Sequence, residues 1–365
     1  MKIHSKSQNG VRPGAATNRR TFGLSAACLV MLLITAGCSP GGNSGAGGGP
    51  VDIHFSTGGA LPPNEQEAAI FNGELEDKGV VKGNGEDYRL EMTFAKGTPE
   101  AQSLLVAGEV EFATLAFSTI ASAQQQNAVP DGFSIVAGHF IDGYPGKFSN
   151  TYLVKEDSGI DSVKDLKGKN IGVNSVGTAV DVIFRNALIK AGLDPESDVR
   201  FVEIGFGAMG QALRDGRIDV GSMVQPFSEQ EMQEGGVKVL TTAKESVGEN
   251  SAIAVVARND FLKENPEAAK SFLADWVSGI KWLDDPANRD EAMKIISDVS
   301  KTPVDVLDLF YGTEKDYYRN PDACPSATAL QAGVDAMVKV GYLENTVDMK
   351  SLVDTSYLPD PDACT

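Results

Sequence analysis

The sequence has few of the residues that supply chemistry at neutral pH, and its charge has mostly one sign. Its 365 residues include three histidines and four cysteines, and 32 basic residues stand against 50 acidic ones, a formal net charge of −18. Nucleic-acid binding needs clustered lysine and arginine to displace counterions from phosphates, so this balance excludes a polyanion-binding surface. Hydrophobic residues make up 42% of the chain, enough for a large core, which excludes a disordered chain. The length allows one large domain or two lobes.

The apolar run near the N-terminus is too short to span a bilayer. It covers residues 24–34, whereas a spanning helix needs about twenty residues. Residues 1–37 contain five basic residues and no acidic one, so the rest of the chain carries −23. Basic residues before a short apolar run predict a signal peptide over residues 1–37. Residues 18–22, Asn-Arg-Arg-Thr-Phe, fit a twin-arginine export signal, and ordinary positive charge before a Sec signal explains them equally well.

The end of the predicted signal peptide resembles a bacterial lipoprotein cleavage site. Residues 34–38 read Ile-Thr-Ala-Gly-Cys, so Cys38 would become the lipidated first residue of the mature chain. The glycine-rich stretch that follows is typical of a flexible tether, and residues 38–50 are assigned to the lipidated cysteine and this tether. We therefore expect a protein anchored by lipid to the cell membrane and facing its extracytoplasmic side.

The remaining cysteines are few enough to suggest a pairing. Cys28 would leave with the signal peptide, while Cys324 and Cys364 each end a Pro-Asp-Ala-Cys tetrapeptide. An oxidising compartment favours a disulfide between them, and two free thiols are the alternative. Because only His54 and His139 remain in the exported part, we expect no metal site and no cofactor.

From residue 51 onward, short apolar runs alternate with helical segments. The runs lie at residues 51–55, 90–94, 110–115, 133–137, 151–154, 170–173, 201–204, 218–224, 237–240 and 252–256. Such alternation predicts a largely parallel sheet, and ligands bind beyond the carboxyl ends of its strands. After Asn259, consecutive helices are expected to start at the dipeptides 265–266, 285–286 and 302–303, each a capping residue followed by proline. On the first of them, Trp276, Ile280 and Leu283 have helical spacing and are assigned to the core.

An approximate internal repeat suggests two similar lobes. Residues 105–115 match residues 213–223 in type at most positions, 108 residues apart. Each copy contains a helix end, a capping glycine and a buried strand. Any strand and helix unit can produce a similar pattern, so the repeat supports two lobes only together with the other features.

Small and hydroxyl-bearing residues follow five of the predicted strands. These loops are residues 56–59, 96–99, 116–119, 174–178 and 224–227. Helix N-termini at such loops bind small anions through backbone N–H groups and the helix dipole, without an arginine. Helix capping alone explains Ser or Thr in any single loop. Five such loops at one edge of the sheets favour a binding cleft.

The motifs that suggest enzymes are incomplete. Residues 205–210 fit Gly-x-Gly-x-x-Gly, but the helix after them ends by Gly216, and Asp219 stands at the start of the next strand, where a ribose-binding acid should stand near its end. Residues 278–281 fit Ser-x-x-Lys, yet the triplets that accompany this motif in serine enzymes are missing. Nucleophile elbow, zinc-protease and Walker motifs are also missing. The sequence therefore predicts a binding protein and not an enzyme.

These features together resemble the substrate-binding proteins of ABC importers. The motifs resemble those of the nitrate, sulfonate and taurine branch, which also includes binders of thiamine-precursor pyrimidines, over about residues 51–285. The strongest matches are residues 158–173, 177–193, 216–219 and 225–227. Val224 and Gln225 replace the aromatic residue and the acid of the family pattern, and residues 116–118 replace a frequent Gly-Asp.

The resemblance implies an α/β, two-lobed, type II periplasmic-binding-protein-like fold. Each lobe would contain a mainly parallel sheet flanked by helices, with a helical C-terminal part. Lobe I would comprise residues 51–146 and 246–365, and lobe II residues 147–245. Hinges near residues 143–150 and 242–250 would let the lobes close on a small-molecule ligand. The closed form, expected to be a monomer, would then dock on an ABC permease in the membrane and bind no nucleic acid.

The resemblance also implies which residues face the ligand. They are Ser56, Thr57, Gly97, Thr98, Phe117, Ser118, Gly177, Thr178, Gln225 and Phe227. Phe94, Tyr144 and Phe206 lie near the strand ends as well, which favours an organic body whose anionic head contacts Gly177 and Thr178. A sulfonate such as taurine is expected first, then an aromatic carboxylate, then a pyrimidine. A pyrimidine-precursor synthase would need Cys or His in the cleft loops, and a sensory or adhesive surface lipoprotein stays open.

Overall fold

The structure is a computed structural model that describes residues 49–59, 63 and 65–364. The predicted signal peptide, Cys38 and most of the predicted tether lie outside these residues. The chain divides into residues 1–47 and a compact unit, residues 48–365, which contains all the described strands. Among the described residues, no helix is both long and apolar enough to cross a membrane.

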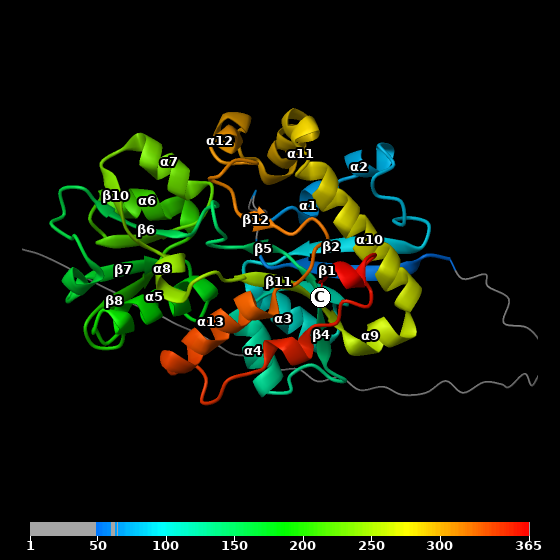
Figure 1. Ribbon diagram of the computed structural model, residues 1–365, viewed down its shortest axis with the longest axis horizontal. Helices are drawn as coiled ribbons and strands as arrows, with labels where there is room; N and C mark the ends of the chain where they lie inside the picture. Colours follow the sequence, from blue (N-terminus) through cyan, green and yellow to red (C-terminus); the bar gives the residue numbers. More distant parts are fainter. Residues whose placement is uncertain (1–48, 60–62, 64, 365) are drawn as a thin grey trace, which may run out of the picture. The chain divides into compact units, whose positions relative to one another are not determined.

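The first five-stranded sheet has the order β2-β1-β3-β11-β4, and β1, β2, β4 and β11 are labelled in Figure 1. Its strands are β1 (Val51–Thr57), β2 (Tyr88–Phe94), β3 (Phe112–Ala116), β4 (Phe133–Gly138) and β11 (Ile253–Arg258). β1 pairs in parallel with β2 and β3, whereas β11 runs antiparallel between β3 and β4. All five residues of β3 are buried, as expected of a central strand that is covered on both faces.

The second sheet repeats this arrangement, with the order β10-β6-β9-β7-β8. Its strands are β6 (Thr151–Lys155), β7 (Asn170–Val173), β8 (Arg200–Glu203), β9 (Val220–Met223) and β10 (Val237–Thr242). β7 pairs in parallel with β8 and β9, and β6 runs antiparallel between β9 and β10. The two copies of the sequence repeat lead into β3 and β9, the central strands of the two sheets. The predicted mainly parallel α/β architecture is confirmed.

Helices connect and cover the sheets. They are α1 (Glu67–Ile70), α2 (Glu74–Asp77), α3 (Thr98–Ala107), α4 (Phe117–Gln125), α5 (Ala179–Lys190), α6 (Phe206–Arg214), α7 (Phe227–Glu234), α8 (Ala243–Val247), α9 (Asn259–Glu264), α10 (Pro266–Leu283), α11 (Arg289–Ser300), α12 (Val304–Asp308) and α13 (Ala327–Lys339). The short strands β5 (Phe140–Ile141) and β12 (Tyr318–Arg319) pair with each other. α10 starts at Pro266 as predicted, whereas Pro286 begins a 3-10 turn before α11 and Pro303 is the residue before α12.

The core beside the first sheet is aromatic. Trp276, Ile280 and Leu283 on α10 are all buried, as their helical spacing predicts. The rings of Phe272 and Trp276 lie with their centroids 6.0 and 5.9 Å from that of Phe55 on β1. α10 therefore packs its aromatic side chains against this sheet.

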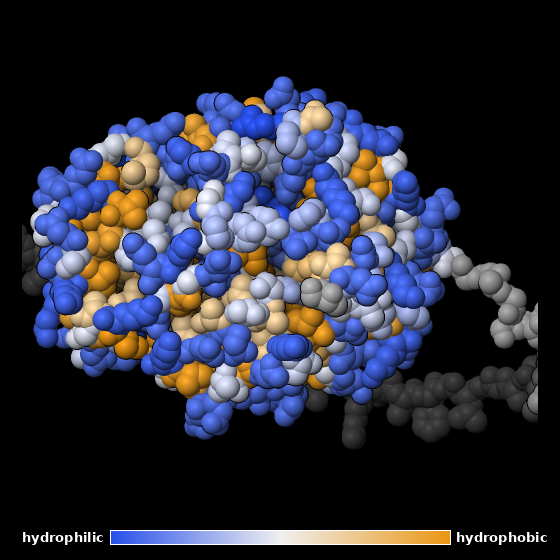
Figure 2. Space-filling model, viewed as in Figure 1, coloured by the Kyte–Doolittle hydropathy of each residue, from blue (hydrophilic) through white to orange (hydrophobic). Residues whose placement is uncertain are grey.

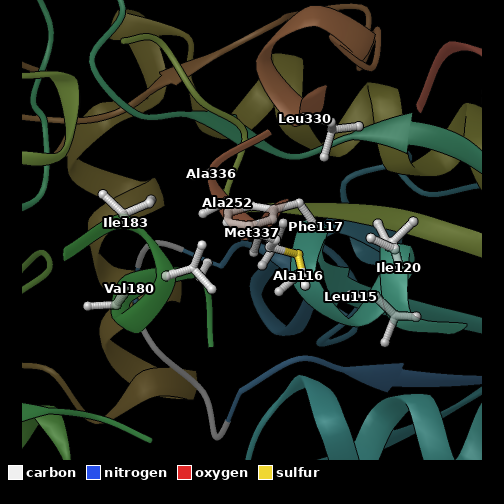
Figure 3. Packing of buried hydrophobic residues seen from close by; sticks show 14 of the residues in the cluster. Leu115, Ala116, Phe117, Ile120, Val180, Ile183, Ala252, Leu330, Ala336 and Met337 are labelled. Carbon is white, nitrogen blue, oxygen red and sulfur yellow. The ribbon is translucent and has the colours of Figure 1, made fainter. Parts of the chain in front are cut away.

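The core around α13 joins helices that follow the two sheets. α13 contacts both α4, which follows β3, and α5, which follows β7 (Figure 1). Figure 3 shows Phe117 and Ile120 of α4 in the same cluster as Ile183 of α5 and Met337 of α13. A Cβ atom at Gly333 of α13 would lie 2.5 Å from the Phe117 ring, so only glycine allows this close approach.

The end of the chain is tied to the body of the compact unit. Cys324 and Cys364 form a disulfide that links positions 40 residues apart, and α13 lies in the loop between them. Leu352 and Leu358, near the end of this loop, are buried. On the face shown in Figure 2, hydrophilic residues predominate and apolar residues form smaller areas between them.

Candidate functional site

Two backbone segments connect the first sheet to the second. Asp142, after β5, and Asn250, before β11, exchange backbone hydrogen bonds with N···O distances of 2.8 and 3.0 Å. The Asp142 carboxylate accepts hydrogen bonds from Ser149 Oγ at 2.6 Å and from the Asn150 N–H at 3.1 Å. Burial raises the pKa of Asp142 to about 6. These segments coincide with the stretches expected to act as hinges.

Residues 315–317, just before β12, make a further connection to the part of the chain that contains the second sheet. The Tyr317 hydroxyl donates to Asn150 Oδ1 at 2.5 Å and accepts from the Gln225 N–H at 3.3 Å. Gln225 Nε2 donates to the Lys315 carbonyl oxygen at 2.8 Å, and Lys315 Nζ pairs with Glu229 at 2.7 Å. Residues 315–317 therefore hold the loop between β9 and α7.

Four of the predicted ligand residues lie at the carboxyl edge of the first sheet. Ser56 and Thr57 end β1 and are buried, and Thr98 opens α3 and is buried at 9% exposure, next to the partly exposed Gly97. The backbone at Gly58 packs closely against α3 and β3, because a Cβ atom there would lie 2.8 Å from both Thr98 Cγ2 and the Thr114 carbonyl oxygen. The Thr57 hydroxyl donates to the Gly59 carbonyl oxygen at 2.6 Å.

Phe117 and Ser118 open α4 directly after β3. The Phe117 ring is fully buried in the core against α13, and its N–H donates to the Ala252 carbonyl oxygen at 3.1 Å. Ser118 is 2% exposed, and its hydroxyl has no hydrogen-bond partner. A buried hydroxyl without a partner is rare in native proteins, and here it lies at the start of a nine-residue helix.

The start of α5 differs from the expectation of free N–H groups. The Gly177 N–H donates to Asp181 Oδ2 at 2.9 Å, and the Val176 N–H donates to Glu203 Oε1 at 2.7 Å. Asp181 is itself fully buried and accepts hydrogen bonds from Arg185 Nε at 2.8 Å and from a tyrosine hydroxyl of the C-terminal part at 2.7 Å. An anion at this helix start would therefore compete with carboxylates of the chain itself.

The structure also shows the surroundings of three more predicted ligand residues, Thr178, Gln225 and Phe227. The Thr178 hydroxyl donates to two oxygens of its own loop, Asn174 Oδ1 at 2.9 Å and the Ser175 carbonyl at 2.8 Å. Gln225 is fully buried, and its Oε1 has no partner. Phe227 is partly buried and stacks on Phe206 with 6.4 Å between ring centroids. The predicted residues of the second sheet thus lie at its carboxyl edge, with the two aromatic rings together.

The fold buries an acidic side chain, Glu67, that no local sequence motif indicates. Glu67, in the first turn of α1, is fully buried, and its Oε1 contacts Thr114 Oγ1 at 2.8 Å and His139 Nε2 at 3.0 Å. Burial acts to raise the pKa of Glu67, but the charge and hydrogen bond of His139 lower it below the ordinary value. Burial and the neighbouring Glu67 carboxylate raise the pKa of Glu65 well above its ordinary value. Because Thr114 and His139 are 47 and 72 residues from Glu67, no local sequence pattern reveals this group.

A surface groove lies apart from the predicted ligand residues. The groove has a volume of about 390 Å³ and is lined by Ala68, Phe71, Asn72, Asn84, Leu90, Met92, Phe94 and Val299. It contains Phe94, one of the rings noted near the strand ends, but none of the ten residues expected to face the ligand. Within the part of the chain that the structure describes, no three His, Cys, Asp or Glu side chains are grouped to hold a metal ion.

Comparisons with known proteins agree with this architecture. A model of the NMT1-like family matches residues 74–297. A Bacillus subtilis protein named as an aliphatic sulfonates-binding protein is 25% identical over 334 residues, which cover 90% of this chain and 94% of that protein. The periplasmic aliphatic sulphonate binding protein SsuA from Escherichia coli has a TM-score of 0.64 at 17% identity, over 84% of this chain and 92% of that chain. The periplasmic nitrate-binding protein NrtA from Synechocystis has a TM-score of 0.63 at 15% identity, over 84% and 85%. The fold is therefore that of periplasmic binding proteins.

Proposed function

Because the chain belongs to the NMT1-like family, we propose that it is the solute-binding component of an ABC importer, and not an enzyme. The observation that carries this proposal is the pair of sheets with the same strand order, joined by the paired segments at Asp142 and Asn250. Two similar lobes on a short double connection suit closure around a small molecule. The relatives compared above are themselves named as binding proteins.

The proposed lobes follow the two sheets. Lobe I comprises residues 51–146 and 246–365, and lobe II comprises residues 147–245. The ligand lies between the carboxyl edges of the sheets, where α/β proteins bind their ligands. The closed, monomeric form then docks on a permease in the membrane.

We propose a small organic anion, a sulfonate or taurine-like compound, as the ligand. The Ser118 hydroxyl supports an anion subsite, because it is buried without a partner at the positive end of α4. The start of α5 supplies less than the sequence predicts, since the N–H groups of Val176 and Gly177 already bind carboxylates. An aromatic carboxylate or a pyrimidine beside Phe206 and Phe227 is the alternative.

Binding assays on residues 49–365 test this proposal, because this part forms a compact unit by itself. We expect taurine or an alkanesulfonate to raise the unfolding temperature and to show saturable binding by calorimetry, more weakly in Ser118→Ala. Thr365, which lies outside the described residues, is kept in the protein. Binding of pyrimidines alone, with no effect of Ser118→Ala, would refute the anion assignment. Binding of no solute from the three classes would count against the importer role.

We also propose that the protein is a lipoprotein with residues 1–37 as its signal peptide and Cys38 as its lipidated residue. The sequence of residues 34–38 supports this. The full-length protein is produced in a bacterium with labelled palmitate. Label should enter the wild-type protein and should be absent from Cys38→Ala. Equal labelling of both proteins, or labelling of neither, would refute the assignment.

A further inference from the structure

The C-terminal helix α13 is fixed to the first sheet on both of its sides. Before α13, the Gly138 N–H at the end of β4 donates to the Ala323 carbonyl oxygen at 2.6 Å. After α13, the Asp354 N–H donates to the Ile135 carbonyl oxygen of β4 at 3.0 Å. We name residues 315–354 the strap. The strap is thus attached to β4 at two places that lie on either side of α13.

Past the end of α13, the strap reaches a buried ion pair on α5. The Tyr342 hydroxyl donates to Asp181 Oδ2 at 2.7 Å, and Arg185 Nε donates to Asp181 Oδ1 at 2.8 Å. The Arg185 guanidinium carbon lies 5.3 Å from the Tyr342 ring centroid and 4.0 Å from that of Phe201 on β8. Asp181 is 0% exposed and Arg185 is 5% exposed. Loss of the Tyr342 hydroxyl would therefore leave a buried carboxylate with one donor fewer.

Apolar packing joins the strap to the same helix. Met337 of α13 and Ile183 of α5 belong to one buried cluster, together with Phe117 of α4 (Figure 3). α4 follows β3 of the first sheet, and α5 follows β7 of the second sheet. α13 therefore packs on elements of both proposed lobes.

The start of the strap contacts the second-sheet part at a different helix. Lys315 Nζ pairs with Glu229 of α7 at 2.7 Å, and the Lys315 carbonyl oxygen accepts from Gln225 Nε2 at 2.8 Å. The Glu229 carboxylate is 12% exposed, so solvent screens this ion pair less than a pair at the open surface. The strap therefore contacts the second-sheet part at α5 and at α7.

These contacts oppose the separation of the two proposed lobes. The strap is fixed to β4, whereas Asp181 and Glu229 belong to helices that follow strands of the second sheet. A rotation that moves α5 and α7 away from β4 must break the bonds of Tyr342 and Lys315. The cost is greatest at Asp181, because its carboxylate is fully buried.

We propose that the strap holds the two lobes together through Tyr342 and Lys315, and that the lobes open only when these residues are released. The proposal rests on the proposed function, because it requires two lobes that move. The strap then sets the fraction of the protein that is open before a ligand binds, and so the apparent affinity for that ligand.

The distance between two spin labels, measured by double electron–electron resonance without ligand, tests the strap. Residues 49–365 carry the labels at Glu91→Cys on β2 and at Asp157→Cys after β6, both exposed positions. The disulfide contains both natural cysteines of this fragment, so only the introduced thiols react. The protein without strap substitutions should show one main distance. Tyr342→Phe combined with Lys315→Met should add a second distance and raise the ratio of open to closed protein at least tenfold.

A matched pair of substitutions removes the same chemistry within lobe I. Tyr88→Phe removes a hydroxyl that donates to the buried Asp275 carboxylate, also at 2.7 Å. Lys78→Met removes the partner of Glu291 at 2.6 Å. Both bonds join residues of lobe I, so this pair should keep the single main distance.

Circular dichroism identifies any variant that is unfolded. If the variant with both strap substitutions does not fold, Lys315→Met alone carries the test, because this side chain is 59% exposed. It should also add the second distance, with a smaller population.

The outcomes distinguish the strap from the proposed function. The same single distance in all variants, or the open distance as the main one before any strap substitution, would overturn the strap. An equal change in the control pair would also overturn it, because general destabilisation would then be the cause. In each case solute binding measured by calorimetry would leave the importer role intact. A second distance confined to the strap variants supports the strap, even where no solute binds and the importer role fails.

Discussion

The Asp142→Asn variant should be less stable than the wild-type protein at low pH and more stable than it at high pH. Asp142 lies where the two sheets are connected and is fully buried. Burial raises its pKa from 3.8 to about 6 in the folded protein. Between these two values the folded state holds a proton that the unfolded state has lost. The stability that this proton provides is therefore present at low pH and lost as the pH rises through about 6.

The size of the effect follows from the pKa difference. About two pH units correspond to about 3 kcal/mol, which the charged carboxylate costs the folded protein at pH 8. Asparagine removes this cost but accepts less well from Ser149 Oγ and the Asn150 N–H, a loss of about 1 kcal/mol. Asp142→Asn should therefore be more stable than the wild-type protein by about 2 kcal/mol at pH 8, and less stable by about 0.5 kcal/mol at pH 4, where the unfolded carboxyl is already partly ionised.

Urea unfolding at several pH values measures this difference. Both tryptophans, Trp276 and Trp282, lie on α10 and report the unfolding of the lobe that contains the first sheet. All other titrating groups are common to the two proteins, so the difference between their free energies of unfolding isolates Asp142. A difference that does not change between pH 4 and pH 8, or a variant less stable at pH 8, would refute the reasoning.

Three further substitutions test how the C-terminal part is held. Cys364→Ser should lower the free energy of unfolding by about 4 kcal/mol, from the loop of 40 residues that the disulfide closes, and dithiothreitol should then affect only the wild-type protein. Gly333→Ala should destabilise the protein by about 1–3 kcal/mol in thermal unfolding, because its Cβ would lie 2.5 Å from the Phe117 ring. Tyr317→Phe should cost about 1–3 kcal/mol in urea unfolding, since it leaves buried Asn150 Oδ1 without its donor.

The glycine substitution has a matched control in another helix. A Cβ atom at Gly207 in α6 would lie 3.7 Å from the Phe227 ring, an ordinary contact distance. Gly207→Ala should therefore leave the protein as stable or slightly more stable, because alanine favours the helix. Equal destabilisation by both substitutions would show that the Phe117 contact is not the cause. A Cys364→Ser protein as stable as the wild type, or a Tyr317→Phe protein unchanged in urea, would contradict the other two predictions.

Much of the secondary structure follows from the sequence alone. All ten predicted strand segments overlap observed strands, because short apolar runs between turn residues define buried strands wherever they occur. The start of α10 at Pro266 also follows from its local residues. The sequence misses β5 and β12, which are two residues each and too short to show a pattern.

The predicted site residues show that the sequence predicts a residue's position in a loop but not its distant packing partners. Loop position places Ser56, Thr57 and Thr98 at the carboxyl edge of the first sheet, where β1 ends and α3 begins in the structure. The same reasoning expects Phe117 to face the ligand, but its ring is buried against α13, more than two hundred residues later. A sequence motif in a loop indicates the local backbone conformation. It does not indicate which distant helix packs on that loop.

The sequence by itself determined the α/β class and the order of the longer strands, and it favoured pairing of Cys324 with Cys364, because each depends on local patterns or on composition. Only the tertiary structure decided which charged groups meet. It placed Asp181 on the Gly177 N–H and buried Glu67 against His139, 72 residues away. Such contacts depend on how distant segments pack, and a buried charge or polar atom without a partner is costly to the folded protein.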